Sequence, residues 1–265
     1  MRINPEKYKI LLIGVSQYPR EKQLPNLPAV KTNVKRLYDI FTNSHILGVP
    51  RQNIILSIDE NKIDIERKLV RFFKHFVNAD DTAIIYYSGH GLVSPENLRV
   101  YLATKDTSFK LLEAESIEIG YLRSLFNSII TKKKVLFIDA CYSGQIHNDF
   151  DVNSFTGGYI ITSTSDNLPA LYPRKAPKNP TYFTGEMIRI LHKGLKNQKP
   201  YISVAELYRE MTERLKKKNL PIPVKSTHSR GNHIIIAKNV YGHRRKPNSN
   251  TLSNLISVIL PRRKE

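Results

Sequence analysis

The chain is poor in cysteine and in acidic residues, and it contains no long apolar run. Its 265 residues include one cysteine, which excludes an intramolecular disulfide framework. No stretch approaches the roughly 18 consecutive apolar residues of a membrane-spanning helix, and the first residues lack the apolar core of a signal peptide. We therefore expect a cytoplasmic protein without a membrane span.

The scarcity of acidic residues leaves a strongly basic chain, with 23 Asp and Glu against 42 Lys and Arg and a net charge of +19. Such a charge attracts nucleic acid, anionic membranes or acidic proteins, and it does not choose among them. The densest basic runs are 214–218, 244–246 and 262–264, and none carries a motif of nucleic-acid readout. We do not expect specific recognition of nucleic acid.

The length and the 40% hydrophobic content suit one large α/β domain. We assign this domain to residues 1–239. From residue 240 the chain turns basic and polar, and we expect a flexible tail over 240–265.

Short apolar runs alternate with stretches of helical periodicity along the domain. The runs predict buried strands at 8–15, 53–58, 82–87, 134–139 and 158–163, a short strand at 99–103, and a last strand at 232–237 that closes the sheet. The helices are expected near 30–41, 65–76, 122–130, 183–191 and 203–215, the last opened by a capping box from Ser203 to Glu206. This alternation predicts a mostly parallel six-stranded sheet with helices on both faces.

Two of the expected strands end in residues with reactive side chains. Cys141 follows the strand at 134–139, and His90 follows the strand at 82–87, between Gly89 and Gly91. A lone cysteine is most often core filling, but ligands of open parallel sheets bind at the carboxyl ends of strands, where both groups fall. The glycines beside His90 leave room for a substrate backbone.

The motifs at 87–91 (YSGHG) and 139–144 (DACYSG) strongly resemble the two catalytic motifs of caspase-like peptidases, in which the histidine lies about 50 residues before the cysteine. The resemblance extends over residues 8–239 through the stretches 27–30, 101–107 and 182–184. It is strongest to the bacterial caspase-like proteins of conflict and defence systems. It implies a caspase-like α/β fold, cysteine endopeptidase activity, and a role in bacterial defence or regulated cell death.

The resemblance also implies catalytic roles. A thiol of ordinary pKa is mostly protonated at neutral pH, so Cys141 would be the nucleophile and His90 the group that takes its proton. The backbone N–H groups of Gly91 and Cys141 would form the oxyanion hole. The family pattern requires no third catalytic side chain and no cofactor. Calcium activation is known among metacaspases, but this sequence does not predict it, because Asp149 and Asp151 alone are too few ligands for a calcium site.

Specificity is predicted from four positions. In metacaspases, which cleave after Arg or Lys, residues matching Asp139 and Ser88 line the pocket for the residue before the cut. The second acidic pocket residue of metacaspases corresponds to Asn33, so this pocket would have one negative charge fewer. Arg174, with Lys175 and Lys178, lies where animal caspases carry the arginine that selects aspartate. We expect a basic preference because Asp139 is two residues from the nucleophile.

An alternative hypothesis is that the chain has the same fold without catalytic activity and acts as an adaptor that binds an acidic protein partner through its basic surface. As a peptidase, the chain acts on protein or peptide substrates, and a regulatory or sensor protein would control it. The segment 145–156 contains no Lys or Arg, so self-cleavage within it is not expected. The basic stretches 132–134 and 174–178 remain as processing sites.

Overall fold

A computed structural model describes residues 3–140, 158–163, 176, 178–197, 199–227 and 231–241. Cys141, Arg174 and most of the basic tail lie outside the described residues, as do Asp149, Asp151 and the segment 145–156. In the described part of the chain, no helix has the length and hydropathy needed to cross a membrane.

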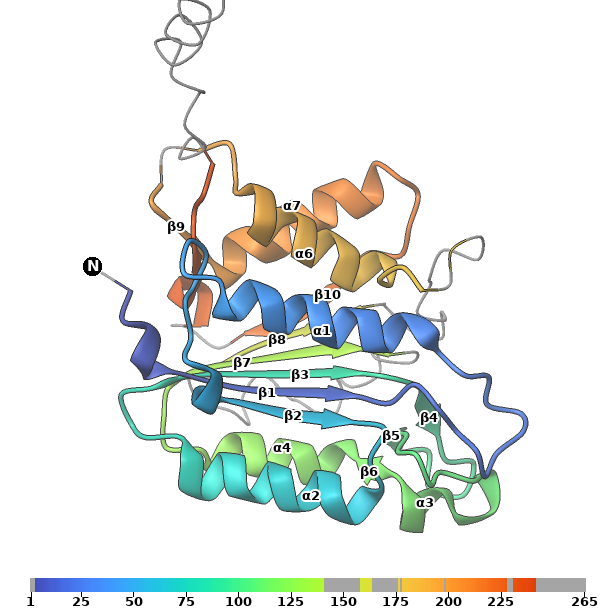
Figure 1. The fold of residues 1–265 in the computed structure, drawn as a ribbon. Helices are drawn as coiled ribbons and strands as arrows, with labels where there is room; N and C mark the ends of the chain where they lie inside the picture. Colours follow the sequence, from blue (N-terminus) through green and yellow to red (C-terminus); the bar gives the residue numbers. More distant parts are fainter. Residues whose placement is uncertain are drawn as a thin grey trace, which may run out of the picture.

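The core of the fold is a six-stranded sheet in the order β10-β8-β7-β3-β1-β2 (Figure 1). Five strands are parallel and β10 is antiparallel to its neighbour β8. The strands are β1 (Tyr8–Gly14), β2 (Ile54–Ile58), β3 (Thr82–Ser88), β7 (Lys133–Asp139), β8 (Gly158–Thr162) and β10 (Val224–Thr227). All residues of β3 and β8 are buried, which explains why these strands appear in the sequence as continuous apolar runs.

Helices cover both faces of the sheet (Figure 1). One face carries α1 (Pro28–Thr42), α6 (Tyr182–Lys193) and α7 (Val204–Lys216), and the other carries α2 (Lys62–Arg71) and α4 (Ile119–Ser128). A π-helical turn (Phe72–Phe76) extends α2, and a short helix α3 (Leu112–Glu115) precedes α4. Alternate strand residues feed the two core layers, as Ile10 and Leu12 face the first layer and Leu11 and Ile13 face the second. The expected α/β architecture is confirmed.

The prediction for the last strand is wrong. The strand near 232–237 is β11 (Ile235–Lys238), which pairs with β9 (Tyr201–Ser203) in a separate two-stranded sheet. The sixth strand of the main sheet is β10, which is partly exposed and contains Lys225, Ser226 and Thr227. An edge strand of this kind lacks the continuous apolar run from which a buried strand can be predicted.

The expected short strand near 99–103 is present but belongs to a third sheet. It is β5 (Val100–Leu102), the centre of a three-stranded antiparallel sheet with β4 (Gly91–Val93) and β6 (Ile117–Glu118). The predicted capping box of α7 is confirmed: Ser203 and Glu206 satisfy each other's backbone N–H groups.

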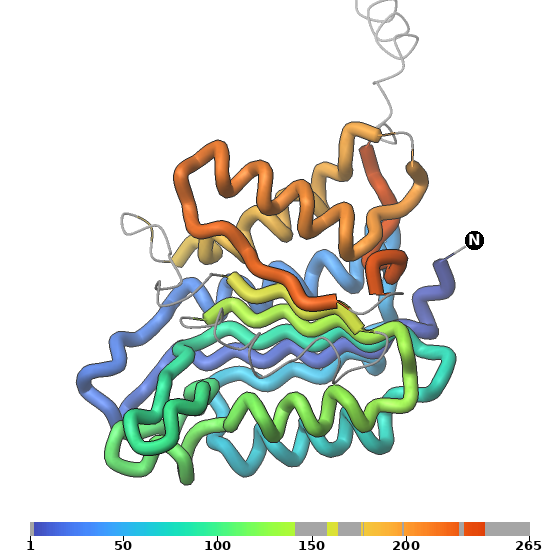
Figure 2. Tube along the Cα trace, turned by 180° about the vertical axis from the view of Figure 1, so that it is seen from behind, coloured from blue at the N-terminus to red at the C-terminus, as the bar shows by residue number. Residues whose placement is uncertain are grey.

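Strand register aligns the carboxyl ends of the three central strands. Gly14 of β1 pairs with Ser88 of β3, and Ser88 pairs with Asp139 of β7. Figure 2 shows these strands running side by side from the opposite viewpoint. The residues that follow β1, β3 and β7 therefore leave the sheet at one edge.

Lys134 is a buried cation inside this sheet. It is 2% exposed, and its ammonium group donates to the carbonyl oxygen of Phe126 at 2.7 Å and lies 5.0 Å from the centre of the Phe126 ring. Burial lowers the pKa of Lys134 from 10.5 to about 8.

Replacement of Lys134 by Met should change how stability depends on pH. Between about pH 8 and 10.5 the unfolded chain holds the Lys134 proton and the folded chain releases it, so the free energy of unfolding of the wild type rises with pH relative to Lys134→Met, by up to about 1.4 kcal/mol per pH unit. Denaturant unfolding across this range measures the difference. Lys133→Met, at an exposed neighbour, is the control, and parallel curves for wild type and Lys134→Met would contradict the prediction.

Candidate active site

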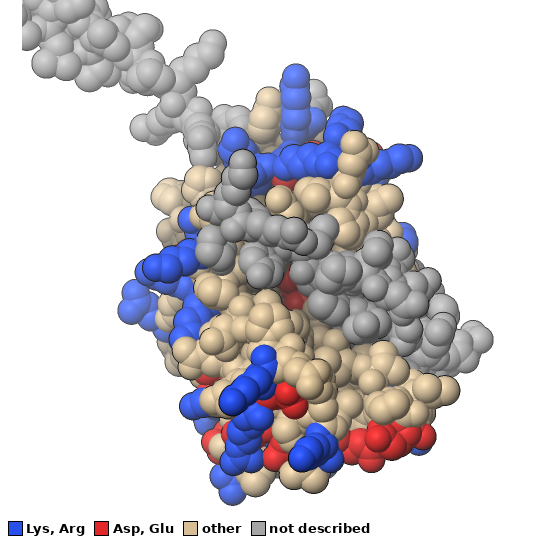
Figure 3. Space-filling model, turned by 90° about the vertical axis from the view of Figure 1, so that its right-hand side faces the viewer, with Lys and Arg blue, Asp and Glu red and all other residues tan. Residues whose placement is uncertain are grey.

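His90 lies just beyond the carboxyl end of β3, in the turn that leads into β4. Its side chain is half-buried. Figure 3 views this edge of the sheet: Lys and Arg lie at the top, along the left side and in the lower part of the face, and Asp and Glu lie mainly in its lower part. The position agrees with the prediction of a functional group at a strand end.

Close packing in front of His90 requires Gly89. A Cβ atom there would lie 2.5 Å from the hydroxyl oxygen of Tyr87 and 3.1 Å from that of Tyr18. Both hydroxyls contact the backbone of His90: that of Tyr18 accepts its N–H at 3.0 Å, and that of Tyr87 shares its hydrogen between the carbonyl oxygens of His90 at 3.0 Å and Ala103 at 2.7 Å. Gly89 thus makes room for two tyrosines rather than for a substrate backbone.

The imidazole of His90 is oriented by a backbone carbonyl. Its Nε2 lies 2.9 Å from the carbonyl oxygen of Pro25, which can only accept, so Nε2 carries the hydrogen and Nδ1 is left as the basic nitrogen. Burial lowers the pKa of His90, and the Pro25 carbonyl opposes this by favouring the protonated ring. The ring is therefore neutral and able to accept a proton at neutral pH.

The loop between β1 and α1 frames the ring. The Tyr18 ring lies 4.7 Å from the imidazole, centre to centre, and its hydroxyl donates to the carbonyl of Val15 at 2.6 Å. The backbone N–H of Tyr18 donates to the side chain of Asn26 at 3.2 Å, next to Pro25. One loop thus supplies both the aromatic contact and the carbonyl that position His90.

Asp139 ends β7 beside this site and is 2% exposed. Its Oδ2 accepts hydrogen bonds from the hydroxyls of Thr181 at 2.5 Å and Thr184 at 2.6 Å, and from the Asn33 amide at 3.3 Å. Thr181 caps α6 and Asn33 lies in α1. The end of the strand is therefore tied to two helices.

The structure brings three of the predicted pocket residues together. The Asn33 amide that contacts Asp139 also reaches the Ser88 hydroxyl at 3.2 Å, and Asn33 Oδ1 accepts the backbone N–H of Thr181 at 3.1 Å. We name the cluster of Asn33, Ser88, Asp139, Thr181 and Thr184 the Asp139 cluster.

The Asp139 cluster is electrostatically incomplete. Burial raises the pKa of Asp139, and hydrogen bonds from Thr181 and Thr184 oppose the rise. Among the described residues, the donors to Oδ2 are all neutral, and Oδ1 is buried without a hydrogen-bond partner. A buried carboxylate without a cation or a full set of donors is costly, so this place favours the arrival of a positively charged group.

Sequence reasoning missed Pro25, Tyr18 and Thr181. Pro25 acts through its carbonyl, which no side-chain pattern reports. Thr184 belongs to a stretch that carried the family resemblance, but without an assigned role, and Thr181 had a readable signal because its side chain accepts the Thr184 N–H at 3.2 Å as a helix N-cap.

Two predicted site residues, Cys141 and Arg174, lie outside the described residues. Cys141 directly follows Ala140, whose carbonyl accepts the Ser163 hydroxyl at 3.0 Å. Gly91 opens β4 opposite Leu102 and is buried. The proposed oxyanion roles of Gly91 and Cys141 remain predictions.

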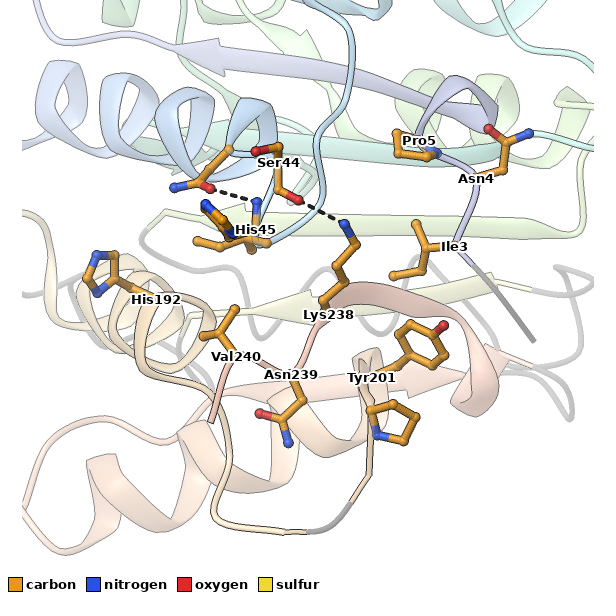
Figure 4. Close-up of a pocket in the computed structure, with 13 residues that line it drawn as sticks. Ile3, Asn4, Pro5, Ser44, His45, His192, Tyr201, Lys238, Asn239 and Val240 are labelled. Atoms are coloured by element: carbon orange, nitrogen blue, oxygen red, sulfur yellow. Dashed lines mark hydrogen bonds between the residues drawn. The ribbon is translucent and has the colours of Figure 1, made fainter. Parts of the chain in front are cut away.

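Other features of the described residues lie away from this edge. A cavity of about 1160 Å³ opens near the amino ends of the strands, with His45, His192 and Lys238 on its wall (Figure 4). It contains no residue of the predicted site. Over the described ranges, no three His, Cys, Asp or Glu side chains gather in the way that metal ligands do.

Gly89→Ala should disturb the site. The added methyl group displaces the tyrosine hydroxyls that hold His90, so we expect a loss of about 1–3 kcal/mol in unfolding free energy together with reduced reactivity at the site. Gly185→Ala is the matched control, because its Cβ would meet only Pro180 at 3.6 Å and alanine favours the helix. Thermal unfolding compares the two, and equal melting temperatures would count against the assigned packing.

His90 should titrate below the ordinary histidine value of 6.5, because burial penalises its charged form. NMR titration of the ring in a Cys141→Ala variant measures this without a thiolate partner. A value at or above 6.5 would show that the ring is more solvated than the structure has it.

The comparisons with known proteins agree with this fold. The family profile described as the caspase domain matches residues 7–235. The crystal structure of Caspase-1 from Spodoptera frugiperda aligns with a TM-score of 0.61 over 85% of this chain and 88% of that chain, at 11% sequence identity, a likeness of fold. A comparison with curated proteins found no match. The predicted resemblance to caspase-like peptidases is confirmed, while the bacterial defence subgroup stays a prediction. The chain belongs to the caspase-domain family of cysteine peptidases.

Proposed function

We propose that the chain is a cysteine endopeptidase that uses Cys141 and His90 to cut after a basic residue. One observation carries the proposal: a neutral, oriented imidazole lies at the same sheet edge as a buried carboxylate whose partners among the described residues are all neutral. The first suits proton transfer from a thiol, and the second suits capture of a basic side chain.

The strand register supports the pairing of the two catalytic groups. Ser88 and Asp139 are partners on adjacent parallel strands. His90 follows Ser88 by two residues, and Cys141 follows Asp139 by two residues. Counted along the sequence, His90 and Cys141 are therefore equally far from one pair of aligned positions.

The reaction follows from these groups. The Cys141 sulfur attacks the peptide carbonyl carbon as Nδ1 of His90 takes the thiol proton, and the backbone N–H groups of Gly91 and Cys141 hold the resulting oxyanion. The C–N bond then breaks, and His90 gives its proton to the departing amine. Water attacks the thioester carbon as His90 takes one of its protons, the C–S bond breaks to release the new carboxyl group, and His90 returns the proton to the Cys141 sulfur. No step needs a cofactor.

The Asp139 cluster supports a basic residue before the scissile bond. A lysine or arginine side chain would supply the positive charge that the described partners of Asp139 do not provide. A preference for aspartate would instead need a cation such as Arg174 in the pocket. Of the basic residues in the stretch 174–178, Lys178 is described, and it is exposed.

The wider role is proposed on the family resemblance. We propose a peptidase domain over residues 1–239 that works in the cytoplasm as an effector of bacterial defence or regulated cell death, under the control of a sensor protein. The alternative function, a non-catalytic adaptor that binds an acidic protein partner, would be favoured if the wild type cleaved nothing across broad substrate sets.

Cys141→Ala should abolish proteolysis, and His90→Ala should reduce kcat/KM by about 10²–10⁴-fold, because one removes the nucleophile and the other its base. Cleavage of fluorogenic peptides by folded variants measures this. His45→Ala is the control, since His45 lies in the cavity at the other end of the sheet (Figure 4). Full activity of either active-site variant would refute the assigned dyad.

A further inference from the structure

We propose that the Asp139 cluster selects lysine over arginine as the residue before the scissile bond. The inference rests on the proposed peptidase function and concerns which oxygens of Asp139 can accept hydrogen bonds from the substrate side chain. Both side chains bring a positive charge, but they differ in how many acceptors they need and in what geometry.

One oxygen of Asp139 is already occupied. Oδ2 accepts two short hydrogen bonds, from Thr181 at 2.5 Å and Thr184 at 2.6 Å, and a longer one from Asn33 at 3.3 Å. The Thr184 hydroxyl is itself 2.7 Å from the Tyr86 hydroxyl, which fixes it in place. Oδ1 is the oxygen left without a donor.

A single oxygen without a donor suits an ammonium group better than a guanidinium group. Arginine binds carboxylates best through two parallel N–H bonds to both oxygens, and Oδ2 could join such a pair only by giving up a threonine. Lysine is a compact charge that needs one carboxylate oxygen and can turn its other N–H groups toward any nearby acceptor.

Asn33 strengthens the distinction because its amide presents a donor to the cluster. The Asn33 Nδ2 group faces Asp139, the Ser88 hydroxyl and the Thr181 hydroxyl. A carboxylate at this position would be a second acceptor for the remaining N–H groups of arginine. With an amide there, fewer acceptors face those N–H groups, and each N–H group buried without a partner is costly. The Ser88 hydroxyl remains as a further acceptor for an ammonium group.

The test compares two fluorogenic peptides that differ only in lysine or arginine before the reporter. We expect wild-type kcat/KM to be about tenfold higher for the lysine peptide. Equal cleavage, or faster cleavage of the arginine peptide, would overturn the inference.

Asn33→Asp should raise the arginine-to-lysine ratio of kcat/KM by about tenfold, because it replaces a donor with a charged acceptor. Asn43→Asp makes the same chemical change at the far end of α1 and should leave the ratio unchanged. An unchanged ratio in folded Asn33→Asp would overturn the inference. Should that variant not fold, Thr184→Val decides, since it frees Oδ2 from one donor and should raise the ratio in the same direction.

Failure of the proposed function has a different signature. A wild type that cleaves neither peptide, or that prefers an aspartate peptide, refutes basic selection as a whole. A wild type that cleaves both basic peptides with arginine equal or ahead keeps the peptidase and refutes the lysine preference.

Discussion

The hydrogen-bonded pairing of β3 with β7 is the constraint on which the candidate site depends. It places Ser88 opposite Asp139, so that the chain leaves both strands at the same level of the sheet. A parallel ladder shifted by one residue would turn Asp139 to the other face, away from α1 and α6. The apolar residues along β3 and β7 prevent such a shift, because each must stay in its own core layer.

The strand end is further fixed by polar contacts between secondary-structure elements. Asn33 and Thr181 link α1 and the start of α6 to Asp139, and every bond in the cluster is made by a neutral donor. Neutral donors hold the carboxylate in place without cancelling its charge. Among the described residues, one oxygen of Asp139 is left without a hydrogen-bond donor, and the well-packed sheet and helices around it supply the stability that this arrangement requires.

Much of the fold was predictable because its strands are buried on both faces and its helices are amphipathic. The position of His90 and the grouping of the predicted pocket residues Asn33, Ser88 and Asp139 were also predictable, since these residues fall at strand ends or within motifs. The strand β10 was not, because an exposed edge needs no apolar run. Pro25 was not either, because its contribution is a carbonyl placed by the path of a loop, and loop paths depend on contacts such as the one between Tyr18 and Asn26.

The carbonyl of Pro25 has a consequence for how this site can vary. A side chain that orients a histidine can be lost through a single codon change, whereas a backbone carbonyl is present whichever amino acid occupies the position. Natural drift at residue 25 therefore leaves the acceptor for Nε2 intact as long as the loop keeps its path. Selection on this part of the site acts on loop length and on the residues that hold the loop, and a scan of side-chain replacements would overlook the contact itself.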